Sequence, residues 1–184
     1  GHALLAKLLK DADELHKVSI IPRGYALGVT WTKPKDEQVH TNKAKLLAQI
    51  TVSLGGRAAE EIVYGKDRVS TGASQDLINV TNIARKMVTA WGMSDKLGNM
   101  AYGKNQENVF MGRDFGHQRD YSEQVAFEID EEMKRIVDEK YEEAKNLLNS
   151  HRDMLEAIAK ELLDKETIDA EEFQDIMDRV SNNA

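Results

Sequence analysis

The sequence predicts a mainly α-helical protein with a small β-sheet, an α+β fold. Apolar residues recur at helical spacing through most of the chain after Asn42. The clearest β-type runs are short and lie near the front of the chain. Both prolines also precede residue 35, so no later segment contains this helix breaker. A chain of 184 residues is long enough for one domain, or for one domain with a helical lobe.

The first forty residues predict a helix end followed by two strands. Apolar spacing over 1–12 is typical of the last part of a helix. A β-type run at 18–21 is followed by a Pro-Arg-Gly turn at 22–24 and a second strand at 26–31. The polar segment 33–41 contains a proline and is predicted to be a loop.

A long helix is predicted from Asn42 to the loop that begins at Gly65. The pair Gly55 and Gly56 lies inside it and costs helix stability, about 1 kcal/mol per glycine relative to alanine. Two adjacent glycines at this cost indicate close packing against another element.

The rest of the chain predicts further helices with one loop-rich interval. The interval from Gly92 to His117 is glycine-rich, with a short strand expected at 100–102. Ser74 and Ser150 are candidate N-caps, and Asp169 with Glu172 forms a candidate capping box. The expected helices cover 77–91, about 122–149, a segment after residue 150, and 169–180.

Composition excludes several classes of function. The net charge of −7 and a pI near 5.3 argue against a nucleic-acid surface. No apolar run approaches the roughly 20 residues that span a bilayer, and charged residues interrupt the only candidate signal sequence. With no cysteine, any metal must be held by histidines and carboxylates. Neither Gly65-Lys66 nor Gly103-Lys104 completes a phosphate-binding loop.

His2 is the first candidate for chemistry. Residues 1–6 read Gly-His-Ala-Leu-Leu-Ala, which matches the second half of a His-Glu-x-x-His zinc helix. In such a helix the two histidines lie four residues apart on one face, so both rings reach one metal. By itself, Gly-His favours a tag remnant or an ordinary free N-terminus over a zinc ligand.

Carboxylates supply the other candidates. Asp76 falls in the first turn of a predicted helix, where it either binds a metal or only complements the helix dipole. Glu60 and Glu61 either reach a metal or pair with Arg57 and other basic residues at helical spacing. The remaining histidines lie in polar stretches and are expected at the surface: His16, His40, His117 and His151.

Three segments in this order resemble the peptidase domain of the FtsH family, the membrane-anchored ATP-dependent zinc metalloproteases. They are residues 1–6, the Gly-Gly-Arg-Ala-Ala-Glu-Glu run within 54–61, and Thr-Gly-Ala-Ser-Gln-Asp-Leu at 71–77. The resemblance extends along essentially the whole chain. It implies a zinc and substrate-strand part at 1–118 and a C-terminal helical part at 119–184.

The resemblance also implies roles for the candidates. His2 and Asp76 match two of three zinc ligands. From its position on the helix, Glu60 is expected to orient a metal ligand or to serve the structure, with a ligand role of its own as the alternative. The first zinc histidine and the general-base glutamate precede the position of Gly1 in the family motif His-Glu-Ala-Gly-His. This chain alone is therefore expected to bind zinc weakly or not at all, and to be inactive.

The predicted strand at 26–31 is a candidate for substrate binding. Zinc proteases commonly bind a peptide as an added strand along a sheet edge, here along Leu27, Gly28, Val29 and Thr30. Gly28 lacks a side chain and would let a peptide backbone approach. The alternative is an ordinary hairpin strand with Trp31 packed on the helices.

Partners and location follow from the resemblance alone. It implies unfolded or membrane proteins as substrates, a homo-hexamer, and ATP with Mg²⁺ and a membrane anchor only through modules that precede the zinc helix. Residues 108–122 look like the bacterial form, which places the protein at the cytoplasmic face of the inner membrane; a mitochondrial or chloroplast membrane is the alternative. The competing function is a non-catalytic interaction or oligomerisation domain that docks through its acidic helices at 122–180.

Overall fold

The computed structural model describes residues 1–22, 28–34, 40–103 and 121–182. Within these residues the protein is mainly helical with one three-stranded sheet, as predicted. None of the described helices is both long and apolar enough to cross a membrane. In chain order the elements are α1 (His2–Leu8), β1 (Glu14–Ser19), β2 (Val29–Lys33), α2 (Lys43–Tyr64), the 3₁₀ turns η1 (Lys66–Arg68) and η2 (Thr71–Ala73), α3 (Ser74–Thr89), α4 (Glu123–Ser150), α5 (Arg152–Lys165), β3 (Thr167–Asp169) and α6 (Ala170–Asn182).

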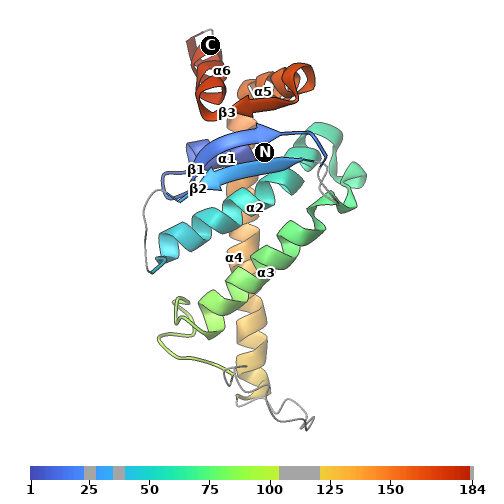
Figure 1. Ribbon diagram of the computed structural model, residues 1–184. Helices are drawn as coiled ribbons and strands as arrows, with labels where there is room; N and C mark the ends of the chain where they lie inside the picture. Colours follow the sequence, from blue (N-terminus) through green and yellow to red (C-terminus); the bar gives the residue numbers. More distant parts are fainter. Residues whose placement is uncertain (23–27, 35–39, 104–120, 183–184) are drawn as a thin grey trace.

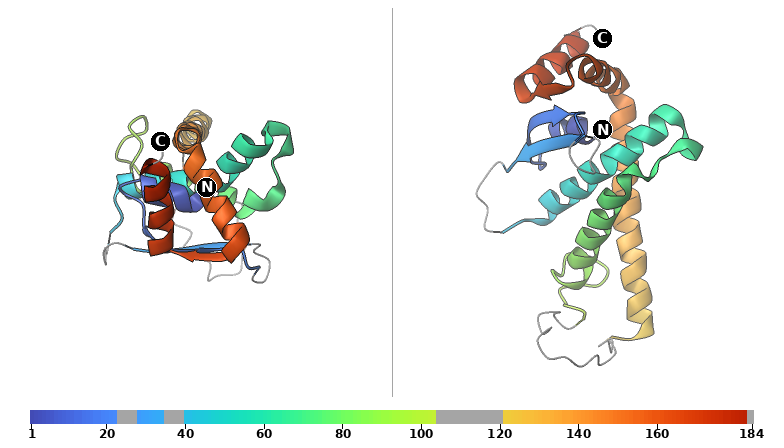
Figure 2. Two further views of the ribbon diagram at one scale, coloured as in Figure 1. Left: turned by 90° about the horizontal axis from the view of Figure 1, so that it is seen from above. Right: turned by 45° about the vertical axis from the view of Figure 1, so that its right-hand side comes forward.

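Helix α4 forms the long axis of the molecule (Figure 1). Helices α2 and α3 pack along it, while the sheet, α5 and α6 gather around its C-terminal end (Figures 1 and 2). Ser122 caps the start of α4, because its side chain accepts a hydrogen bond from the backbone N–H of Val125 at 3.2 Å. The start of the chain lies near the C-terminal helices α5 and α6, and α1 packs between these helices and α2 (Figure 2).

The sheet is antiparallel, with strand order β2-β1-β3. Val18 in the central strand pairs with Thr30 on one side and with Ile168 on the other. Among the described residues, β2 pairs only with β1 and is therefore an outer strand of the sheet. The third strand was not predicted, because three residues are too short for an alternating pattern.

The predicted strand bounds were wrong by several residues. The first strand begins at Glu14 rather than residue 18, so His16 lies inside it and is exposed. A bulge between Leu15 and Lys17 lets Leu15 and Val18 both point inward, which hides the usual alternation in the sequence. The second strand runs over 29–33 instead of 26–31, and residues 23–27 lie outside the described part.

Three further local predictions were wrong. Residues 100–102 form no strand, and the backbone N–H of Tyr102 instead donates to Thr89 O at the end of α3. Ser150 is the last residue of α4, and its hydroxyl donates back to Asn146 O. Ser74 is the first residue of α3 rather than its cap. The capping box of Asp169 and Glu172 is confirmed, because each side chain accepts from the other's backbone N–H.

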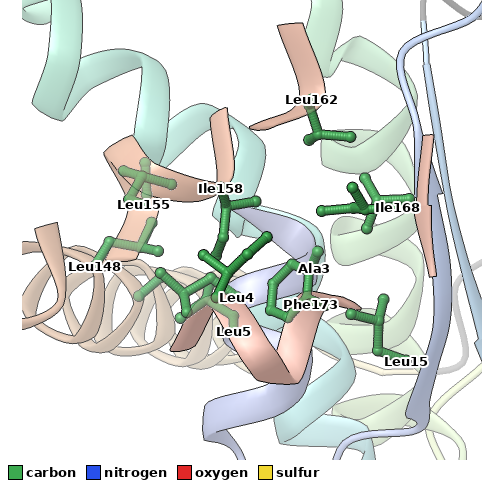
Figure 3. Close-up of a cluster of buried hydrophobic side chains, with 14 residues drawn as sticks. Ala3, Leu4, Leu5, Leu15, Leu148, Leu155, Ile158, Leu162, Ile168 and Phe173 are labelled. Atoms are coloured by element: carbon green, nitrogen blue, oxygen red, sulfur yellow. The ribbon is translucent and has the colours of Figure 1, made fainter. Parts of the chain in front are cut away.

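Two buried cores hold these elements together, and α4 contributes to both. The first core joins α1, β1 and α2 to the C-terminal end of α4, α5, β3 and α6 (Figure 3). Its fully buried side chains include Leu4, Leu5, Leu148, Ile168 and Phe173. The second core joins α2 and α3 to the N-terminal half of α4, with Ile50, Val80, Met87 and Ile129 fully buried. The helices after residue 122 thus complete the packing around the front of the chain.

Candidate metal centre

The glycine pair in α2 positions the start of α1. A Cβ atom at Gly55 would lie 3.0 Å from Gly1 C and 3.1 Å from His2 N, closer than side chains normally approach a backbone. A Cβ atom at Gly56 would lie 2.4 Å from His2 Cε1. The predicted close approach is therefore confirmed, and the element that approaches is the one that carries His2.

Asp76 is held by the turn that precedes α3. The Ser70 side chain accepts from Gly72 N at 3.1 Å and caps η2. The Ser74 hydroxyl donates to Thr71 O at 2.6 Å, which closes the turn into the first residue of α3. Asp76 lies in the first turn of that helix, as predicted, where the helix dipole favours its negative charge.

Glu60 fastens this turn to α2. Its two carboxylate oxygens accept hydrogen bonds from the Ser70 hydroxyl at 2.5 Å and from Ser70 N at 3.2 Å. The hydrogen bonds of Glu60 are thus with the segment that leads to Asp76. Ser70 was not singled out from the sequence, although a serine before Thr-Gly-Ala is a recognisable cap signal.

His2 and Asp76 meet although 74 residues separate them. His2 Nε2 lies 3.3 Å from Asp76 Oδ2, and each side chain is 32% exposed. A charge-assisted N–H···O hydrogen bond is shorter, about 2.7–2.9 Å. Two atoms that bind one tetrahedral zinc at about 2.0–2.2 Å lie about 3.3–3.5 Å apart. The imidazole nitrogen and the carboxylate oxygen therefore fit two neighbouring zinc ligands.

The described residues do not supply a complete metal site. They contain no group of three or more histidines, cysteines and acidic residues that could hold a metal. Glu61 is engaged elsewhere: it accepts from the Tyr141 hydroxyl at 2.5 Å and lies 3.1 Å from Lys145 Nζ, which fastens α2 to α4. The Tyr141 hydrogen bond, followed by that of Lys145, lowers the pKa of Glu61, so it stays charged. Its partners are on α4 and not on its own helix, contrary to the pairing expected from helical spacing.

The predicted substrate strand is only partly within the described residues. Val29 and Thr30 begin β2, and Leu27 lies outside the described part. Gly28 precedes the strand, and a Cβ atom there would lie 2.9 Å from Ser19 O. The space at Gly28 is thus filled by the protein's own β1 and not left open for a peptide.

The other histidines that the structure describes do not join His2. His16 and His40 are exposed, and His151 Nδ1 lies 2.8 Å from Leu147 O. His117 lies outside the described residues.

Comparisons with known proteins identify the family of this chain. The sequence model of Peptidase family M41 matches residues 1–176. A protein of Synechococcus sp. named ATP-dependent zinc metalloprotease FtsH is 50% identical over 97% of this chain and 28% of its own length. A protein of the same name from Bacillus subtilis is 48% identical over 97% of this chain and 28% of its own length. Another, from Veillonella parvula, is 52% identical over 92% of this chain and 26% of its own length. The chain thus spans little more than a quarter of the length of these relatives, and by the extent of the family match it belongs to peptidase family M41.

Proposed function

We propose that this chain is the proteolytic part of an ATP-dependent zinc metalloprotease that hydrolyses peptide bonds in unfolded and membrane proteins. The observation that carries the proposal is the 3.3 Å approach of His2 Nε2 to Asp76 Oδ2. Two helices that are distant in sequence converge on this contact, and α2 provides the Gly56 gap that admits the ring. The family membership and the names of the relatives support the same reading.

His2 and Asp76 would hold the zinc as two of its three protein ligands. When bound, the zinc lowers the pKa of a water molecule and polarises the scissile carbonyl. The remaining ligand and the general base would come from residues that precede Gly1, as in the His-Glu-Ala-Gly-His motif. Glu60 would act on Asp76 through Ser70, by fixing the turn from which α3 starts.

β2, an outer strand of the sheet, would bind the substrate backbone. An added strand pairs through main-chain N–H and C=O groups, so this mode of binding depends little on the substrate sequence. Val29 and Thr30 are the first two residues of this strand. In the intact protein we further propose a homo-hexamer, with ATP, Mg²⁺ and a bacterial inner membrane contacted through segments outside these residues. We also propose that residues 1–118 form the zinc and substrate-strand part and that residues 119–184 form the C-terminal helical part.

The test compares this 184-residue chain with a longer chain that includes the preceding residues. We expect the longer chain to bind close to one zinc and to cleave casein until a chelator is added. The 184-residue chain should bind zinc weakly and cleave nothing, because the proposed first histidine ligand and general base belong to the preceding residues. Chelator-sensitive cleavage at equal rates by both chains would contradict the proposed roles.

The competing function is an interaction domain without catalysis. The encoded residues just before Gly1 distinguish the two functions. His-Glu-Ala at those positions supports the protease, and any other sequence supports the interaction domain.

A further inference from the structure

One face of helix α2 supports both halves of the candidate metal site. Gly56 and Glu60 are four residues apart and share this face. Gly56 makes room for the His2 ring, and Glu60 holds the turn that leads to Asp76. The position of this part of α2 therefore affects where both candidate ligands lie.

Glu61 leaves the same helix on a different face and fastens it to α4. Successive residues of a helix are about 100° apart around its axis, so Glu61 does not point with Glu60. Its carboxylate accepts from the Tyr141 hydroxyl at 2.5 Å and lies 3.1 Å from Lys145 Nζ. Lys145 is four residues after Tyr141 on α4, and its Nζ lies 5.5 Å from the centre of the Tyr141 ring. The three side chains thus form one cluster between the two helices.

This cluster is largely shielded from water. The side chains of Glu61 and Lys145 are 20% and 24% exposed, and the Tyr141 ring packs against both cores. The Tyr141 hydrogen bond, followed by that of Lys145, lowers the pKa of Glu61, while burial and then the Glu61 contact raise the pKa of Tyr141. Glu61 is therefore a charged carboxylate that depends on its two partners from α4, because burial without them disfavours its charge.

We propose that Tyr141 and Lys145 are positioning residues for the metal site, which they reach through Glu61 and helix α2. The inference rests on the proposed zinc protease function. If Glu61 loses both partners, the end of α2 is expected to turn so that the carboxylate reaches water. The face of α2 that supports the two candidate ligands turns with it, because both faces belong to one helix. Helix α4 of the C-terminal part thus acts on zinc binding from a distance.

The test measures zinc affinity in the longer chain that carries Tyr141→Phe and Lys145→Met together. These changes remove the hydroxyl and the charge and keep most of each side chain's volume. We expect the dissociation constant for zinc to rise about tenfold, the lower end of the effect of losing a group that orients a metal ligand. The visible spectrum of the Co²⁺-substituted protein, which reports ligand geometry, should change as well. In the metal-free 184-residue chain, hydrogen exchange of the amides at 70–76 should become faster, because the turn loses its support.

Glu132→Gln is the matched control for a general loss of stability. Glu132 is also a hydrogen-bonded carboxylate at α4, but it bonds Ser94 and Arg135 and not α2. Its variant should keep the parent's zinc affinity and Co²⁺ spectrum, and so should Lys145→Arg, which retains a cation for Glu61.

Tyr141→Phe alone repeats the test if the double variant does not fold. The parent's zinc affinity and Co²⁺ spectrum in a folded variant would overturn this inference alone, and so would an equal loss of affinity in Glu132→Gln. A longer parent chain that binds no zinc would instead overturn the proposed function, and this inference with it.

Discussion

The ring of His2 occupies the space that a side chain at Gly56 would fill. A Cβ atom at Gly56 would lie 2.4 Å from His2 Cε1, and its two next nearest atoms belong to the same ring. The backbone of Gly56 is ordinary α-helix and does not itself need glycine. The requirement for glycine at this position therefore comes from the histidine, which links the packing of α2 directly to the candidate metal site.

Gly56→Ala should weaken zinc binding without unfolding the protein. The added methyl group forces the His2 ring away from Asp76, while alanine improves helix propensity by about 1 kcal/mol. In the longer chain we expect zinc affinity to fall at least tenfold, with helical content by circular dichroism unchanged. Val63→Ala, an exposed change on the same helix, is the control and should bind zinc normally. Normal zinc affinity in a folded Gly56→Ala protein would show that zinc binding does not need the His2 ring in this position.

Glu132 should give the protein part of its acid sensitivity. This buried carboxylate accepts from Arg135 Nε at 2.7 Å and from the Ser94 hydroxyl at 2.9 Å. The Arg135 hydrogen bond, with a smaller contribution from Ser94, lowers the pKa of Glu132 below its ordinary value of 4.5. Its stabilising contribution is therefore fully present above that value and is lost as the pH falls through the lower folded-state pKa.

Glu132→Gln tests this contribution by urea unfolding at several pH values. At pH 7 the free energy of unfolding should fall by about 1.5–3 kcal/mol, the range for hydrogen bonds to a charged group. The difference from the parent protein should shrink as the pH falls from 4.5 through the lower folded-state pKa of Glu132, at which the parent also loses the charge. Glu131→Gln removes a neighbouring carboxylate whose ion pair with Lys96 is exposed, and it should change stability by less than about 1 kcal/mol. A constant difference between the Glu132→Gln and parent proteins across the whole pH range would contradict the account.

A chain that ends at residue 121 should not fold. Both cores need residues from α4: the first uses Leu148, and the second uses Ile129 and Ile136. Removing α4 exposes the apolar faces of α2 and α3 that pack on it. We expect loss of the cooperative thermal transition and binding of a hydrophobic dye. A cooperative transition in the shortened chain, with zinc binding in its longer form, would show that the front part folds alone.

The helices could be predicted from the sequence because their signals are local. Apolar spacing located α2, α3 and α4, and the capping box at Asp169 marked the start of α6. The strands were predicted less well, because the bulge after Leu15 and the partner strand at Ile168 depend on residues distant in the chain. The turn residues Ser74 and Ser150 were mistaken for caps, since a serine near a helix end can also donate to a carbonyl within the turn.

The sequence named candidate residues for the site, but it could not show how the elements that carry them come together. His2 and Asp76 could be named from their motifs, and Gly55 and Gly56 indicated a close approach by some element. The identity of that element and the Glu60–Ser70 contact required the fold.

We propose that Asp76, and not Glu60, binds the metal together with His2. The most direct measurement is zinc content in the longer chain, by atomic emission, for Asp76→Asn and Glu60→Gln. Asp76→Asn removes a ligand charge at constant size and should lower zinc from near one per chain to a small fraction. Glu60→Gln keeps an oxygen acceptor for Ser70 and should retain most of the zinc. Full zinc in the Asp76→Asn protein, with loss of zinc in Glu60→Gln, would contradict the account and would transfer the ligand role to Glu60.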